Sequence, residues 1–165
     1  MPAPQKPLSV DIHTATKDGD MIKVQEFLEE GGDVNVRCRY QTIPLHRAAA
    51  YSHLDIATLL LEKGADIEAR DGVGHTPLFW AAKGGHTDMV DLLLSKGAHI
   101  NAQDKKERTP LHEAARHGRK EMCALLLKRG AKRDVMDCDA NEPGEDSEPT
   151  VPENLRRQIR ELIES

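Results

Sequence analysis

The chain has 165 residues, of which 38% are hydrophobic and only five are aromatic. It lacks an apolar run long enough to cross a membrane, so we expect no membrane insertion. The net charge of −5 is uneven, because residues 134–165 carry ten acidic and three basic side chains, which leaves residues 1–133 at +2. These values indicate one folded domain with a small core of aliphatic residues.

The N-terminal and cysteine patterns indicate a reducing compartment. Residues 1–7 contain three prolines and no apolar stretch, so we expect residues 1–9 to be a disordered leader rather than a signal peptide. The three cysteines are odd in number and lack Cys-x-x-Cys spacing, which argues against a disulfide framework or a zinc site. We therefore expect the protein in the cytoplasm, the nucleus or both.

A repeat of 33 residues organises most of the chain. Proline recurs at this interval, at Pro44, Pro77, Pro110 and Pro143. The segments that recur with it are Ile43–Ala49, Thr76–Ala82 and Thr109–Ala115, and then Leu59–Leu61, Leu92–Leu94 and Leu125–Leu127. A fixed period of this length predicts stacked copies of one supersecondary unit.

The central copy shows what each unit contains. Thr76 supplies a capping oxygen and Pro77 suits the first position of a helix, where its missing N–H has no partner. A second helix is expected from about Thr87 to Lys96, followed by Gly97 in the left-handed conformation that ends helices. The turn residues Asp71–Gly74 predict a projecting hairpin between units.

These residues resemble the ankyrin-repeat family, whose Thr-Pro-Leu-His-x-Ala pattern and 33-residue period they share over about residues 10–137. The resemblance implies an all-α ankyrin-repeat solenoid, in which stacked helix-turn-helix units carry projecting β-hairpin loops. We expect an N-terminal capping repeat at about residues 10–36 and full repeats at about residues 37–69, 70–102 and 103–135.

The C-terminal part departs from the repeat. Between residues 134 and 153 there are eight acidic and no basic residues, so we expect an acidic loop over residues 138–152. Leu155, Ile159 and Leu162 then follow at helical spacing. They predict a capping helix over residues 153–165 that covers the open end of the stack.

Nothing in the sequence describes an enzyme. His46 and His112 resemble the family's structural histidine, which bonds the capping threonine and nearby backbone. No metal-ligand spacing, phosphate-binding loop or nucleophile motif is present, so we expect no catalytic residues, no metal and no cofactor. Asn35 and Asn101 stand at a hairpin position that can be hydroxylated in this family, although a turn-forming role is the main expectation for them.

The resemblance also implies a binding surface, because family members bind partners in a concave groove between the hairpin tips and the first helices. Trp80, the only tryptophan, falls near the middle of this groove and suits an interface hot spot. Carried over residue by residue, the partner-binding positions are Arg37, Arg39, Tyr40, Arg47, Tyr51, Arg70, His75, Trp80, Lys83, Lys105, Lys106, Arg108, Glu113 and Arg116. Most of them are basic.

The sequence therefore favours a non-catalytic protein–protein interaction module, or adaptor, that binds a partner of acidic character in a basic groove. We expect the chain to be monomeric on its own. Two alternatives stay open. The chain can be a regulatory or substrate-recruiting segment of a larger enzyme or channel, or its arginines can bind anionic lipid or nucleic acid. The acidic C-terminal part and the scarcity of base-stacking aromatics count against nucleic acid.

Overall fold

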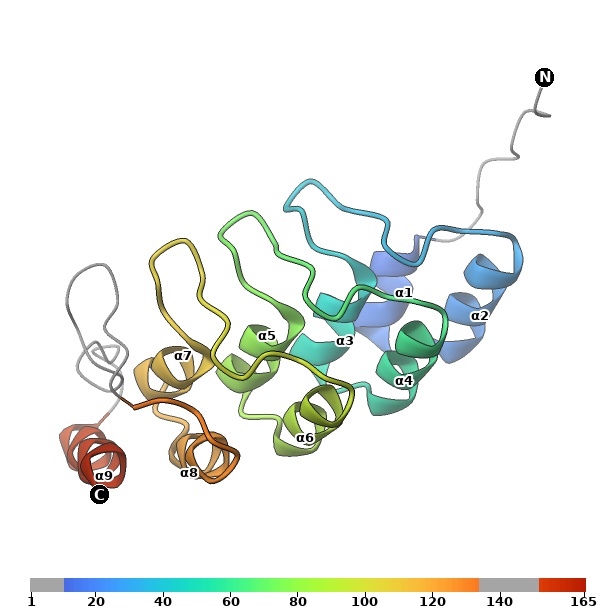
Figure 1. Cartoon of the computed structure of the whole chain (residues 1–165). Coiled ribbons are helices and arrows are strands. Elements are labelled where there is room, and N and C mark those ends of the chain that lie inside the picture. Colours follow the sequence, from blue (N-terminus) through green and yellow to red (C-terminus); the bar gives the residue numbers. More distant parts are fainter. Residues whose placement is uncertain (1–10, 134–151) are drawn as a thin grey trace.

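The computed structural model describes residues 11–133 and 152–165, which contain nine helices and no strand (Figure 1). The predicted leader at residues 1–9 and the predicted acidic loop, apart from Pro152, lie outside the described residues. The helices are α1 (Ile12–Asp18), α2 (Met21–Glu29), α3 (Pro44–Tyr51), α4 (Leu54–Glu62), α5 (Pro77–Gly84), α6 (Thr87–Ser95), α7 (Pro110–Arg116), α8 (Lys120–Lys128) and α9 (Glu153–Glu164).

The helices form two rows that run along the stack. Helices α1, α3, α5 and α7 pack side by side in the first row, and each packs against the following helix, from α2, α4, α6 and α8, in the second row. Three hairpin loops project from the first row in the same direction, and α9 packs on α8 at the end of the stack (Figure 1). This arrangement confirms the all-α solenoid of helix pairs.

Local sequence explains where the helices begin and end. Pro44, Pro77 and Pro110 each occupy the first turn of a first-row helix, where a missing N–H costs nothing. In the central unit, Gly97 follows the second-row helix with φ 94°, a left-handed conformation that glycine adopts without steric cost. The prediction for Gly97 is thus confirmed.

The core consists of small and aliphatic side chains that recur with the repeat. Leu60, Leu93 and Leu126 are fully buried in the second row. Alanines such as Ala81 and Ala114 are fully buried in the first row, where their small side chains let neighbouring helices approach closely. The middle unit replaces the structural histidine by Phe79, which is also fully buried.

Hydrogen bonds of one kind recur at each junction between units. His53 Nε2 lies 3.0 Å from the Lys17 carbonyl oxygen, and His86 Nε2 lies 3.0 Å from that of Ala50. Arg119 takes the same place in the last junction and donates from Nε to the Lys83 carbonyl oxygen at 3.0 Å. These bonds tie each unit to the one before it.

Helix α9 covers α8 with a slightly different face from the one predicted. Ile159 and Ile163 are its buried residues, whereas Leu155 and Leu162 are only half-buried. Ile163 was not singled out in the sequence because its neighbour Leu162 fits the spacing equally well. A helix that packs on one side of a stack end buries only a narrow stripe, and Ile163 lies nearer its centre.

Candidate functional site

The three hairpins are joined to one another, and several basic residues of the predicted groove make these links. Backbone bonds run from Gly72 N to the Tyr40 carbonyl oxygen at 3.0 Å and from Lys105 N to the Val73 carbonyl oxygen at 3.1 Å. Arg37 donates across the first junction to the Arg70 carbonyl oxygen at 2.8 Å. The bonds that repeat this linkage in the second junction are Arg70 to the Gln103 carbonyl oxygen and Lys105 Nζ to the Gly72 carbonyl oxygen. These three cations hold the hairpins in register.

In the second hairpin, the side chain of Asp71 accepts hydrogen bonds that hold the loop together. Asp71 Oδ1 accepts from the backbone N–H groups of Val73 at 3.0 Å and His75 at 2.9 Å, and its Oδ2 accepts from Trp80 Nε1 at 3.1 Å. The indole is therefore fixed, half-buried, with Lys83 Nζ 5.9 Å from its ring centroid. The fold itself therefore holds Trp80 in one orientation.

Asp104 plays the same part in the third hairpin. Its Oδ1 accepts from the backbone N–H groups of Lys106 at 2.8 Å and Arg108 at 3.0 Å. Its Oδ2 accepts from Arg108 Nε at 3.0 Å and lies 3.2 Å from His75 Nε2. Burial alone would raise the pKa of Asp104, but the hydrogen bonds from Arg108 and from the backbone lower it overall.

Two of the predicted groove residues of the third unit, Arg108 and Glu113, pair with each other, which differs from the expectation of an accessible basic groove there. Arg108 is 9% exposed and Glu113 is 3% exposed, so both are buried rather than presented to a partner. Arg108 Nη1 lies 3.4 Å from Glu113 Oε2, and Glu113 Oε1 lies 3.0 Å from His117 Nε2. A buried carboxylate beside a buried guanidinium satisfies charges that desolvation would otherwise penalise.

In the first hairpin a cysteine takes the place of the aspartate. Cys38 Sγ accepts from the backbone N–H of Tyr40 at 3.4 Å and lies 2.9 Å from Thr42 Oγ1. Burial raises the pKa of the Cys38 thiol, but the contacts with Thr42 and Tyr40 and the charge of Arg47 lower it overall. The sulfur thus replaces the hairpin bonds of the aspartate without its fixed negative charge.

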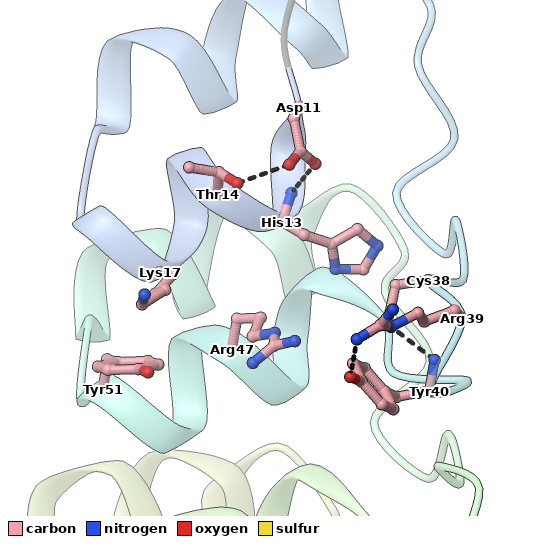
Figure 2. Close-up of a pocket in the computed structure, with 9 residues that line it drawn as sticks. All are labelled: Asp11, His13, Thr14, Lys17, Cys38, Arg39, Tyr40, Arg47 and Tyr51. Atoms are coloured by element: carbon pink, nitrogen blue, oxygen red, sulfur yellow. Dashed lines mark hydrogen bonds between the residues drawn. The ribbon is translucent and has the colours of Figure 1, made fainter.

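A pocket of about 350 Å³ opens between this first hairpin, α1 and α3. Figure 2 shows the Arg47 side chain between the residues of α1 and those of the hairpin, with no hydrogen bond to the other residues drawn. The residues that line this pocket, which we call the Arg47 pocket, are Asp11, His13, Thr14, Lys17, Cys38, Arg39, Tyr40, Arg47 and Tyr51.

A second pocket of about 600 Å³ lies next to it, and we call it the Trp80 pocket. Arg39, Tyr40 and Arg47 line both pockets, so the two adjoin. The Trp80 pocket is completed by residues from the first two hairpins and from α5, and they are Gln41, Thr42, Asp71, Gly72, Val73 and Trp80. Both volumes fall within the range of about 300–1,000 Å³ that is usual for ligand pockets.

The other predicted positions do not line either of the two pockets. Lys83 and Lys106 are exposed, and Arg116 is half-buried. His75 stacks on Phe79, with the ring centroids 5.0 Å apart. The positions that the structure brings together around the two pockets are Arg39, Tyr40, Arg47, Tyr51 and Trp80.

The structural roles expected for two histidines are confirmed. His112 Nδ1 lies 2.9 Å from Thr109 Oγ1, and His46 Nδ1 accepts from the backbone N–H of Ile43 at 3.2 Å. Burial lowers the pKa of His46 to about 4, so the ring is neutral at neutral pH. In the middle unit, where Phe79 replaces the histidine, Thr76 Oγ1 has no hydrogen-bond partner among the described residues.

The asparagines at the candidate hydroxylation positions connect neighbouring units. Asn35 Oδ1 accepts from Asp66 N at 2.8 Å and its Nδ2 donates to the Gly64 carbonyl oxygen at 3.1 Å. Asn101 Oδ1 accepts from Lys132 N at 2.8 Å. Their side chains therefore bond the next unit rather than their own turn. Hydroxylation of either asparagine stays a prediction.

Within residues 11–133 and 152–165, no cluster of three or more His, Cys, Asp or Glu side chains is arranged to hold a metal ion. In the same part of the chain, no helix combines the length and apolar character that crossing a bilayer requires.

Comparison with protein families identifies the repeat. The sequence matches the family described as ankyrin repeats, in three copies, over residues 12–71 and 69–137. The chain belongs to the ankyrin-repeat family. A comparison with curated proteins finds no match. Ankyrin repeats generally mediate protein–protein interaction and are typically non-catalytic modules.

Three residues of this ankyrin-repeat surface were missed from sequence, although a signal for them was present. Cys38, Asp71 and Asp104 stand 33 residues apart and occupy the same place in successive hairpins. Comparing the repeats column by column would have shown a cysteine where the next two repeats have aspartate. That substitution removes an acidic residue from the first hairpin. A count of basic residues over all three hairpins does not show this difference.

Proposed function

We propose that this ankyrin-repeat chain is a non-catalytic interaction module that binds a partner protein on the side of the stack where the hairpins meet the first-row helices. One observation carries the proposal. In the described part of the chain four large hydrophobic side chains are exposed, and three of them, Tyr40, Tyr51 and Val73, border the two adjoining pockets. Clustered exposed apolar side chains mark interaction sites.

The chemistry of this surface suits a protein partner of acidic character. Trp80 offers an aromatic anchor that Asp71 already holds in place, so little conformational entropy is lost on binding. Lys17, Arg39 and Arg47 around the same pockets supply positive charge, which steers an acidic partner toward them. We further propose the cytoplasm or the nucleus as its compartment, because the cysteine pattern suits a reducing environment.

An affinity capture experiment tests this function. The intact chain and the variants Trp80→Ala and Val73→Gln are immobilised, and captured proteins are identified by mass spectrometry. Ile22→Ala is the matched control, since Ile22 is 69% exposed on α2, in the second row of helices. Proteins captured by the intact chain and by the control, but lost with both pocket variants, are the expected result. Equal capture by all four proteins would refute the proposed surface.

A further inference from the structure

The first repeat lacks a negative charge that the next two repeats possess. Cys38 takes the position of Asp71 and Asp104, and Arg47 takes the position of Trp80 and Glu113. In the second repeat the aspartate accepts a hydrogen bond from the indole that follows it. In the first repeat a guanidinium stands where the indole would be, and the carboxylate that would face it is absent.

Among the described residues, Arg47 is consequently a cation without a counter-ion. Its side chain is half-buried, and its Nε is shielded from solvent with no hydrogen-bond partner among the described residues. Asp11 is the single acid among the described residues that line the Arg47 pocket, but its carboxylate caps α1 by accepting from His13 N at 3.1 Å and Thr14 Oγ1 at 2.6 Å. Because Arg47 lines both pockets and no carboxylate of the described residues pairs with it, its guanidinium favours binding of an anion there.

The neighbouring Trp80 pocket requires a different group. Tyr40 and Val73 are 55% and 53% exposed and face solvent at its border, and Trp80 lines it from α5. Because Arg47 and Tyr40 line both pockets, a ligand that places an anion on Arg47 has its next group close to Trp80. The complementary ligand therefore carries an anionic group beside a large apolar group.

We propose that the two pockets bind a short peptide segment of a partner protein, in which the carboxylate of an Asp or Glu takes the place of the missing hairpin aspartate beside Arg47 and a neighbouring large apolar side chain occupies the Trp80 pocket. The proposal rests on the function proposed above and specifies the chemistry of its partner. Cys38 is the specificity-determining position, because a thiol in place of a carboxylate there leaves the carboxylate site open.

Four other basic residues of this face are held by contacts within the fold, which argues for a peptide over a polyanion. Nucleic acid and anionic membranes are held by many cations at once, each neutralising one phosphate. Here Arg37, Arg70 and Lys105 donate to backbone carbonyl oxygens between hairpins. Arg108 is paired with Asp104. Among the described residues that line the two pockets, Arg47 thus offers a guanidinium without an acidic partner next to the Trp80 pocket, which suits one carboxylate.

The test begins with a random peptide library displayed on phage and selected against the full chain. Selected peptides are synthesised with a fluorescent label, and their dissociation constants are measured by fluorescence polarisation. We expect an Asp or Glu within two residues of a large apolar residue in the selected sequences. Replacing that acid by its amide should weaken binding by about tenfold or more, as expected when a buried charge loses its partner.

Two substitutions in the protein then decide the site. Cys38→Asp places a carboxylate of the protein itself beside Arg47, where it would compete with the peptide, so we expect about tenfold weaker peptide binding. The new ion pair should also raise the melting temperature by about 2–4 °C. Cys38→Ser is the matched control, because a hydroxyl fits the same space without charge, and it should bind as the parent does. Loss of binding with a gain in stability distinguishes occupancy of the site from simple damage to the fold.

Arg47→Gln provides the second arm, which does not depend on how Cys38→Asp folds. It should weaken binding by about tenfold, whereas Lys63→Gln, which removes the same charge at the exposed end of α4, should have no effect. Unchanged binding by both Arg47→Gln and Cys38→Asp would overturn the inference and leave the proposed function standing on another surface. Failure of the capture experiment above, by contrast, would remove the proposed function itself.

Two further outcomes would also overturn the inference. One is that no peptide is selected. The other is that an oligothymidylate or phosphatidylserine vesicles bind more tightly than the peptides and lose that binding with Arg47→Gln. The latter result would assign the Arg47 pocket to a phosphate rather than to a carboxylate.

Discussion

The replacement Leu93→Ala tests the packing that holds the repeats together. Leu93 is fully buried in α6, in the middle of the stack. Removing three carbons costs about 2.4 kcal/mol of transfer free energy at about 0.8 kcal/mol for each. A residual cavity of about 50 Å³ adds roughly 1 kcal/mol. We therefore expect the free energy of unfolding to fall by about 3–4 kcal/mol.

The neighbouring leucines supply the control. Leu92 and Leu94 have the same side chain in the same helix, but both are only half-buried. Their replacement by Ala should cost about 1–1.5 kcal/mol each, because less apolar surface is returned to water. Urea unfolding followed by circular dichroism gives the three values by linear extrapolation. A loss at Leu93 that is below about 1 kcal/mol, or no larger than at Leu92, would refute the helix register.

Three further predictions concern charge, the end of the stack and pH. Arg108→Met leaves Asp104 buried without its cation and should lower the free energy of unfolding by about 3–5 kcal/mol, whereas Arg39→Met, at an exposed site, should change it by less than about 0.5 kcal/mol in the same urea assay. Deleting residues 153–165 exposes the outer side of α8, so we expect a lower melting temperature and association during gel filtration, and an unchanged monomer would contradict this. Burial lowers the pKa of His46 from 6.5 to about 4, so the unfolded chain binds the proton first as the pH falls. Stability should therefore decline between pH 6.5 and 4 by up to about 3 kcal/mol more than in a His46→Gln variant. Equal pH profiles of the urea midpoint would show that His46 does not titrate as described.

The sequence by itself determined the fold, because the repeat encodes contacts that are nearly local. Each unit carries its own helix starts, its own glycine stop and its own apolar positions, as Thr76, Pro77 and Gly97 show for the central copy. Stacking then follows, because a single helix pair cannot bury its apolar face by itself and does so only against a neighbouring copy. The structural role of His112 could be foreseen for the same reason, because its partner Thr109 is three residues away.

Only the tertiary structure decided which basic residues of the proposed binding face are engaged within the fold. Arg37 keeps its charge but is tied to a carbonyl oxygen 33 residues away, whereas Arg108 is neutralised by buried Asp104 and Glu113, and a count of basic residues shows neither contact. Arg47 differs because the residue that would neutralise it is Cys38, on a separate hairpin loop. The sequence determines which residues carry a charge. Whether that charge can attract a ligand from solvent depends on the partners that the fold places beside it.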